Sequence, residues 1–299
     1  MYERLQSSLL VTGASGHLGR RVVELLLEAG ARNIVAASRD PDKLAELVAK
    51  GAQSRKVDFD DPGTLDVAFT NIERILIVST DAIFVPGKRL QQHKAAVDAA
   101  AKAGVKHIVY TSMPNPEPPS RMAIAADHYG TEQAIEKSGV GFTILRNCWY
   151  ADNFFRSLPA VLASGKWFTC AGEGRMPYVS RADIARAAAA ALACETTENK
   201  RHDITGLERL TTAEIAAIVS EVFGKKIEVV HLSEEEFAKA LIARGTPEAW
   251  VPGSIATESS IRAGKFDITS DAIKHLTGRE PQSLRDFFIA NKTAFMPGG

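Results

Sequence analysis

The stretch LLVTGASGHLG, residues 9–19, decides the fold of this chain. Leu9–Val11 is a short apolar run that predicts a buried strand. From His17 onward, apolar residues recur at helical spacing until Gly30 ends the pattern. Glycines stand at positions 13, 16 and 19, around the start of this helix. A strand, a glycine-rich turn and a helix in this order are typical of a dinucleotide-binding unit.

The glycines have separate roles in this pattern. Gly13 and Gly16 let the backbone turn tightly and lie against a pyrophosphate, and Gly19 lets the helix sit close to the strand. The free N–H groups at the helix start face the phosphates. A flexible loop without a ligand is the alternative, and the position between a first strand and a first helix favours cofactor binding. The predicted contacts are Gly13, Ser15, Gly16, His17, Leu18 and Gly19.

The composition limits the class of protein. The 299 residues include 36 basic and 36 acidic side chains, so no bulk charge indicates nucleic acid or an anionic membrane as a partner. The three cysteines are far apart, without a CxxC pair or a Cys/His cluster, which favours a reducing compartment and no metal site. No signal peptide or membrane-spanning run is evident. We expect a cytoplasmic protein.

Strands and helices alternate through the first half of the chain. This rhythm predicts a Rossmann-type α/β fold, a doubly wound parallel sheet covered on both faces. The predicted strands after the first are residues 34–37, 54–59, 74–79, 107–112 and 142–146, and the helices after the first are 41–50, 62–69, 88–103 and 123–137.

The second half loses this regularity. Residues 1–150 are expected to form the dinucleotide-binding domain, and residues 151–299 a smaller α+β substrate lobe, some segments of which return to the first domain. Residues 165–180 read as irregular extended chain. The predicted helices are 150–163, 183–194, 212–223, 234–244 and most of the tail from 270, and the predicted strands are 203–205 and 227–232.

The end of the second strand indicates which cofactor binds. Ligands lie beyond the carboxyl ends of parallel strands, and an acidic residue there usually accepts from the adenosine ribose. This strand instead ends on Ser38 and Arg39, with Lys43 one helical turn further on. A guanidinium and an ammonium suit a 2′-phosphate, which favours NADP. The alternative makes both cations solvated surface charges and Asp40 the ribose ligand of NAD.

Two further strand ends complete the predicted cofactor site. Asp58 and Phe59 end the third strand and are placed to flank the adenine. Ser79 and Thr80 end the fourth strand and would lie near the phosphates or the nicotinamide ribose.

Four motifs together resemble the NmrA-like atypical short-chain dehydrogenases, most closely the quinone and triphenylmethane dye reductases among them. The likeness covers almost the whole chain, and the combination of motifs is narrower than the glycine motif alone. The motifs are TGASGHLG, the strand end Ser38-Arg39-Asp40-Pro41, YTS at 110–112, and LRNCWYADNF at 145–154. The segment His128-x-x-Thr131-Glu132 makes the likeness narrower. The resemblance adds Thr111 and Ser112 to the cofactor contacts.

The helix at 123–137 departs from ordinary short-chain dehydrogenases. Their Tyr-x-x-x-Lys pair is replaced by His128 and Glu132, and Tyr129 is followed four residues later by Gln133. Tyr129 points about 100° away from His128, so it is a substrate contact at most. His128 either protonates the acceptor or holds the substrate, or it is a structural histidine bonded to Glu132.

The resemblance places the nicotinamide and substrate pocket after the sixth strand. Asn147 is expected to hold the carboxamide or the substrate, and Trp149 to line the substrate pocket or to pack the lobes together. Arg146 is expected to form a structural ion pair. His93 is expected on a solvated helix face, residues 114–119 as a mobile lip, and Asp183 at a helix start.

The leading hypothesis is NADPH-dependent reduction of quinones by direct hydride transfer from the nicotinamide. The absent tyrosine–lysine pair fits an acceptor that needs little protonation. One alternative keeps the fold and reduces triphenylmethane or azo dyes. The other is a non-catalytic NADP(H)-binding redox sensor. The chain is a possible homodimer.

Overall fold

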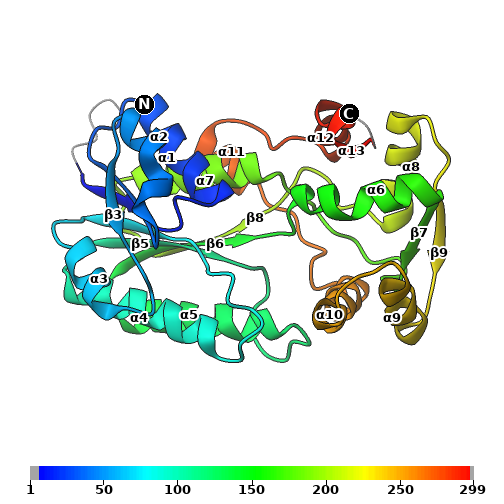
Figure 1. Cartoon of the computed structure of the whole chain (residues 1–299), viewed down its shortest axis with the longest axis horizontal. Coiled ribbons are helices and arrows are strands. Elements are labelled where there is room, and N and C mark those ends of the chain that lie inside the picture. The colour runs from blue at the N-terminus through cyan, green and yellow to red at the C-terminus, as the bar shows by residue number, and fades with distance from the viewer. Residues whose placement is uncertain (1–6, 297–299) are drawn as a thin grey trace.

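A computed structural model describes residues 7–296 of the chain, and a parallel sheet organises them (Figure 1). Within these residues the sheet has seven strands in the order β3-β2-β1-β4-β5-β6-β8, all parallel. This confirms the predicted Rossmann-type fold. The strands are β1 (Leu9–Val11), β2 (Ile34–Ser38), β3 (Gln53–Lys56), β4 (Arg74–Ile77), β5 (His107–Ser112), β6 (Gly141–Asn147) and β8 (Lys200–Ile204).

Successive side chains of each strand serve opposite faces of the sheet, which explains the continuous apolar runs. Leu9 and Val11 face a core with α1 and α7, whereas Leu10 faces the core with α3 and α4. Figure 1 shows α1, α7 and α11 on one side of the sheet, and α3, α4 and α5 on the other. The helices are α1 (His17–Glu28), α3 (Pro62–Ala68), α4 (Lys88–Lys102), α5 (Ala123–Lys137), α7 (Arg181–Ala193) and α11 (Ala272–Thr277).

The strand order reverses beside β1, which lies between β2 and β4. In open α/β sheets, ligands bind in the crevice outside the carboxyl ends of the strands at such a reversal. The glycine stretch follows β1 directly, so the fold places it at this crevice.

Three elements from the second half of the chain belong to this sheet layer. β8 pairs with β6, α7 packs against α1, and α11 packs against α7. The Arg74 side chain donates to the backbone oxygens of Ala191 and Leu192 at the end of α7, and so ties that helix to β4. The boundary at residue 150 stays a prediction.

A second lobe lies to one side of the sheet (Figure 1). It contains the parallel strand pair β7 and β9 and an aromatic core that includes Phe154, Phe288 and Phe295. Its regular elements are α6 (Phe154–Ser164), β7 (Lys166–Thr169), α8 (Thr212–Phe223), β9 (Glu228–His231), α9 (Glu234–Ala243), η3 (Glu248–Trp250), α10 (Val251–Arg262), α12 (Leu284–Ala290) and α13 (Lys292–Phe295).

Several predicted elements need correction. The helix expected at 41–50 is a 3₁₀ turn, η1 (Pro41–Leu44), followed by α2 (Ala45–Ala49), and that at 150–163 begins as η2 (Ala151–Asn153). β3 ends at Lys56 because the backbone of Asp58 bonds to the Thr64 hydroxyl in a turn. The stretch at 165–180, expected to be irregular, contains β7. The helix α10 was not predicted from the sequence.

Candidate functional site

The glycine loop, residues 13–19, is open to solvent at the start of α1. Gly13 turns the chain with a positive φ of 62°, and the Gly16 N–H donates to the Gly13 oxygen at 2.9 Å. Gly16 caps α1 without any side chain filling the helix start. Gly13, Ser15, Gly16 and His17 are exposed. The first N–H groups of α1 therefore remain available to an anion.

Gly16 and Gly19 differ in what a side chain would meet. A Cβ at Gly19 would lie 2.5 Å from the Gly13 oxygen, which no real side chain tolerates. A Cβ at Gly16 would lie 3.3 Å from the same oxygen, which is tight but can be relieved by a small shift. Leu18, also predicted to contact the cofactor, has its side chain buried in the core beneath α1. Gly19 therefore serves the packing of the loop, and Gly16 keeps its outer face clear.

The structure distinguishes the two cations predicted to meet a 2′-phosphate at the end of β2, because Lys43 lies beside the Asp40 carboxylate. The exposed Arg39 forms no hydrogen bond or ion pair with any residue between 7 and 296. Asp40 is occupied, because its carboxylate accepts from the Asp42 N–H and lies 3.5 Å from the Lys43 ammonium. The buried Ser38 hydroxyl donates to Ser15 at 2.9 Å, which links β2 to the glycine loop.

The other predicted cofactor residues lie along the same edge of the sheet. The Asp58 carboxylate accepts from the Asp60 N–H, and Phe59 packs partly buried against the apolar core. The Ser79 N–H donates to the Thr111 hydroxyl at 2.9 Å, which joins the ends of β4 and β5. Thr80 lies between β4 and α4, where its N–H donates to His93 Nε2 at 3.0 Å.

A buried polar group, here called the histidine cluster, lies between α4, α5 and β5. It consists of Arg89, His93, Tyr110, His128 and Thr131, all of them buried. An Arg89 Nη atom lies 3.1 Å from His128 Nε2, and His128 Nδ1 lies 2.8 Å from the Tyr110 hydroxyl. His93 Nδ1 lies 2.9 Å from the Thr131 hydroxyl.

The donors around the two histidines determine their protonation. A guanidinium and a backbone N–H can only donate, so His128 Nε2 accepts from Arg89, and His93 Nε2 accepts from the Thr80 N–H at 3.0 Å. Each neutral ring then carries its proton on Nδ1. Burial, with a smaller effect of the Arg89 charge, lowers the pKa of His93 to about 3 and that of His128 far below its usual value.

These contacts correct two expectations. His93 is fully buried, not solvated, and His128 is not bonded to Glu132. Glu132 instead accepts from the Ser112 hydroxyl at 2.5 Å and pairs with the Arg146 guanidinium at 2.7 Å. The expected structural ion pair of Arg146 is thereby confirmed. Tyr129, half-buried, makes no hydrogen bond with any residue between 7 and 296.

Asn147 ends β6 with a buried amide that has no hydrogen-bond partner among the described residues. Burial raises the pKa of the Tyr150 phenol, and the Asn147 amide acts on that pKa in the opposite direction. The two side chains do not reach hydrogen-bond geometry. A buried amide without a partner costs free energy unless a ligand or water satisfies it. Trp149 packs against Phe266, with ring centres 6.0 Å apart.

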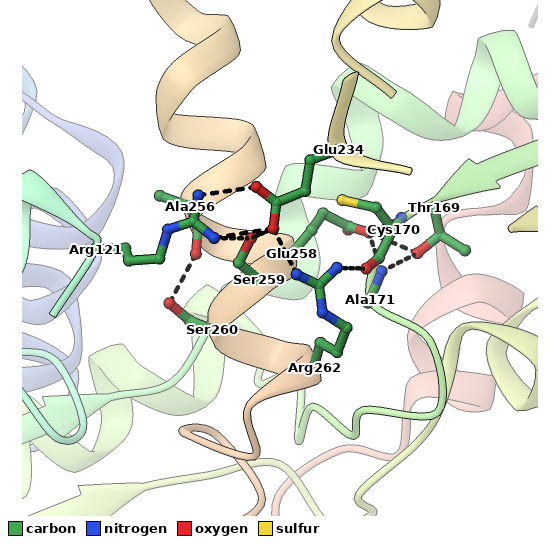
Figure 2. Close-up of polar contacts among 10 residues, drawn as sticks. All are labelled: Arg121, Thr169, Cys170, Ala171, Glu234, Ala256, Glu258, Ser259, Ser260 and Arg262. Carbon is green, nitrogen blue, oxygen red and sulfur yellow. Dashed lines mark hydrogen bonds and ion pairs between the residues drawn. The ribbon is translucent and has the colours of Figure 1, made fainter. Parts of the chain in front are cut away.

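The second lobe is held to the sheet domain by ionic contacts (Figure 2). Arg121 precedes α5 and bonds the Glu234 carboxylate at 2.8 and 2.9 Å, and Glu234 also binds the Ser259 hydroxyl and Arg262. These contacts lower the pKa of Glu234 far below its usual value. A cavity of about 440 Å³ borders this group between α9 and α10.

The loop expected to be a mobile lip also reaches the second lobe. The Asn115 amide donates to the Lys265 oxygen at 2.6 Å, and the Glu117 carboxylate binds Arg146 at 2.5 Å. Asp183 lies at the start of α7 as expected, where the Ser180 hydroxyl accepts from its N–H.

Residues 7–296 contain neither a metal-binding group of side chains nor a helix that spans a membrane. In this range no three His, Cys, Asp or Glu side chains are grouped so as to hold a metal ion. No helix there is both long and apolar enough to cross a membrane. Cys148, Cys170 and Cys194 are free thiols.

The parallel sheet, the open glycine loop and the free Arg39 define the class of Rossmann-type dinucleotide-binding proteins. The family model described as the NmrA-like family matches residues 6–265, so the chain belongs to the NmrA-like family.

Relatives and solved structures match over nearly the full length. Quinone oxidoreductase 2 of Escherichia coli is 33% identical over 95% of this chain and 99% of its own. An NAD(P)H azoreductase of Xenophilus azovorans is 29% identical, covering 96% and 99%. The Escherichia coli NADPH-dependent quinone oxidoreductase solved with NADPH has a TM-score of 0.89, at 32% identity over 95% and 99%. Triphenylmethane reductase of Citrobacter sp. with NADP(H) has a TM-score of 0.88, at 35% identity over 96% and 100%.

Proposed function

We propose that this chain is an NADPH-dependent oxidoreductase that reduces quinones by direct hydride transfer. The observation that carries the proposal is the open glycine loop with the free Arg39 beside it, on a fold that matches an NADPH-dependent quinone oxidoreductase over nearly its full length. The dye reductases among the relatives share the fold, but no feature of this site favours a dye over a quinone.

The chain's residues would bind the cofactor along the strand ends. The first N–H groups of α1 bind the pyrophosphate, and Gly13 and Gly16 leave room for it. Arg39 binds the 2′-phosphate, while Asp40 remains engaged with Lys43 and Asp42. Asn147 holds the carboxamide or the acceptor, because its buried amide otherwise stays unpaired. Bound NADPH supplies the hydride.

The proton follows from water. Hydride addition to a quinone leaves a hydroquinone anion, and a proton from solvent completes the reduction. His128 holds no proton to give to a ligand, because its Nδ1–H faces Tyr110 and its Nε2 accepts from Arg89. We propose that His128 orients the buried Arg89 guanidinium by accepting its hydrogen bond. Arg89 also donates to the Thr80 oxygen at 2.7 Å. We propose in addition a cytoplasmic location and a homodimer.

Oxidation of NADPH, followed by the nicotinamide absorbance with and without benzoquinone, tests the function. We expect oxidation that depends on both enzyme and quinone and that is slower with NADH. A protein that binds NADPH tightly and oxidises none with any quinone is a redox sensor, and that result would refute the proposal.

A further inference from the structure

The loop from Asp81 to Gly87 rises from the proposed site and is held firmly at its base. Arg89 Nε donates to the Thr80 oxygen at 2.7 Å, and the Lys88 ammonium pairs with Asp60 at 2.6 Å. Gly87 turns the chain into α4 with a positive φ of 73°. Both ends of the loop are therefore anchored at the carboxyl end of β4, where the nicotinamide half of the cofactor is expected.

The tip of this loop exposes three consecutive apolar side chains. Ile83, Phe84 and Val85 are 36%, 51% and 58% exposed. The other exposed large apolar residues of the described chain are isolated from one another in sequence: Val48, Val67, Leu207, Ile242, Ile289 and Met296. Scattered apolar residues are ordinary on a protein surface, whereas a contiguous patch marks a surface that binds something.

The tip meets an aromatic residue of the second lobe. The Phe84 ring lies edge-on to Trp250, with ring centres 4.8 Å apart and planes at 77°. Trp250 ends η3 just before α10, and the Arg156 guanidinium of α6 lies 4.8 Å from its ring centre. Phe84 remains half exposed in spite of this contact, so part of its surface is free for a ligand.

We propose that Phe84 and Trp250 form an aromatic subsite that binds the apolar ring or substituent of the electron acceptor. The inference rests on the proposed function and names the class of acceptor: fused-ring or alkylated quinones in preference to small polar ones. Aromatic rings attract one another in edge-to-face and offset geometries, and burial of apolar surface adds to the affinity. The quinone head lies toward Asn147, and the apolar part extends toward Phe84.

The test compares two acceptors in matched variants. Steady-state kinetics are measured for benzoquinone and for menadione, a methylated naphthoquinone, in the wild type, Phe84→Ala and Trp250→Ala. Loss of one aromatic contact should raise the KM for menadione about twofold to tenfold and leave that for benzoquinone unchanged. Ile289→Ala removes an equally exposed apolar residue on α12 and should change neither KM. Thermal melting and NADPH titration confirm that the variants fold and bind cofactor.

Several outcomes would overturn the subsite. The subsite is wrong if the KM for menadione is the same in the wild type and all variants. It is also wrong if the KM values for menadione and benzoquinone rise by the same factor in the aromatic variants. A change of sedimentation in Phe84→Ala with unaltered KM values would assign the patch to a second copy of the chain. If the wild type reduces no quinone, the proposed function fails. The subsite is then tested separately by measuring the binding of menadione to the NADP⁺ complex by calorimetry. Binding that is weakened in both aromatic variants would support it, and unchanged binding would contradict it.

Discussion

The carboxyl edge of the sheet carries two polar regions that differ in what their groups contact. In the glycine loop, the helix start has no side-chain cap. The nearby exposed Arg39 forms no hydrogen bond or ion pair among residues 7–296, although its charge adds to the effect of Lys88 in lowering the pKa of Asp60. In the histidine cluster, both histidines bond at both ring nitrogens, mostly to buried neighbours. Only one Arg89 nitrogen in the cluster is left unpaired. The first region is arranged to receive a ligand, and the second to hold the scaffold beneath it.

The contacts of the two regions distinguish polar residues that cannot be told apart from the sequence alone. Polar residues at strand ends all qualify as candidate ligands, but a saturated buried group must break existing bonds before it can bind anything. The comparison therefore predicts large binding effects in the glycine loop and effects mainly on stability in the histidine cluster.

Gly16→Val should have the largest effect, because its branched side chain would occupy the space in front of the helix start. We expect no detectable NADPH binding in calorimetry and a melting temperature near that of the wild type. Gly19→Ala is the matched contrast, since its Cβ would lie 2.5 Å from the Gly13 oxygen. That variant should lower the melting temperature or fail to fold. Tight NADPH binding by folded Gly16→Val would contradict the role of the loop.

Asn147→Ala should lower turnover roughly 10²-fold, because displacing the reacting groups by about 1 Å can cost that much. The Asn147 amide bonds to no described residue, so its removal should leave the melting temperature unchanged or raise it. Stopped-flow oxidation of bound NADPH measures the effect. A melting temperature lowered by several degrees would mean that the amide serves the fold.

The histidine cluster should make stability depend on pH. His93 has a pKa of about 3 when folded and about 6.5 when unfolded, so the unfolded chain binds more protons between these values. The free energy of unfolding should therefore fall as the pH drops below 6.5, on the order of 1–3 kcal/mol by pH 4. Urea titrations at each pH measure it.

His93→Gln keeps an acceptor for Thr80 and a donor for Thr131 without titrating, and should make this dependence shallower, with His128 still contributing to it. Exposed His231→Gln is the control and should not change it. A dependence as steep in His93→Gln as in the wild type would show that His93 is not buried as a neutral ring.

Arg39→Ala should weaken NADPH binding about tenfold or more and leave NADH binding nearly unchanged, because a charge-assisted contact contributes about 1.5–3 kcal/mol. Titration calorimetry with both cofactors measures the effect, with Lys43→Ala alongside. Equal affinity of the wild type for NADPH and NADH would instead make Asp40 the ribose ligand.

The fold and the glycine loop could be predicted because their signals are local. The apolar runs of β1 and β4 and the glycine spacing each lie within about a dozen residues. His93 also had a local signal, since Ala96, Val97 and Ala100 follow at helical spacing and place it on the buried face of α4. Because histidine is polar, His93 is expected from the sequence on the solvated face of the helix and not with these apolar residues.

Contacts between distant segments left no such signal. Arg121 and Glu234 are separated by 113 residues, and Phe84 meets Trp250 across the lobes. The bonds of Glu132 to Ser112 and Arg146 likewise depend on how α5 lies against two strands. The partners of such side chains depend on the tertiary packing and therefore cannot be predicted from the local sequence.

The most direct test of the comparison is single-turnover reduction of benzoquinone by His128→Gln. A glutamine can accept from Arg89 and donate to Tyr110 but cannot deliver a proton near neutral pH. If the histidine cluster is scaffold and protons come from water, the rate should stay within about threefold of the wild type, well short of the 10²–10⁴-fold loss of a general acid. His128→Phe, which leaves Arg89 without its acceptor, should instead lower the melting temperature. A 10²-fold slower rate in folded His128→Gln that binds NADPH normally would contradict the account and make His128 the proton donor.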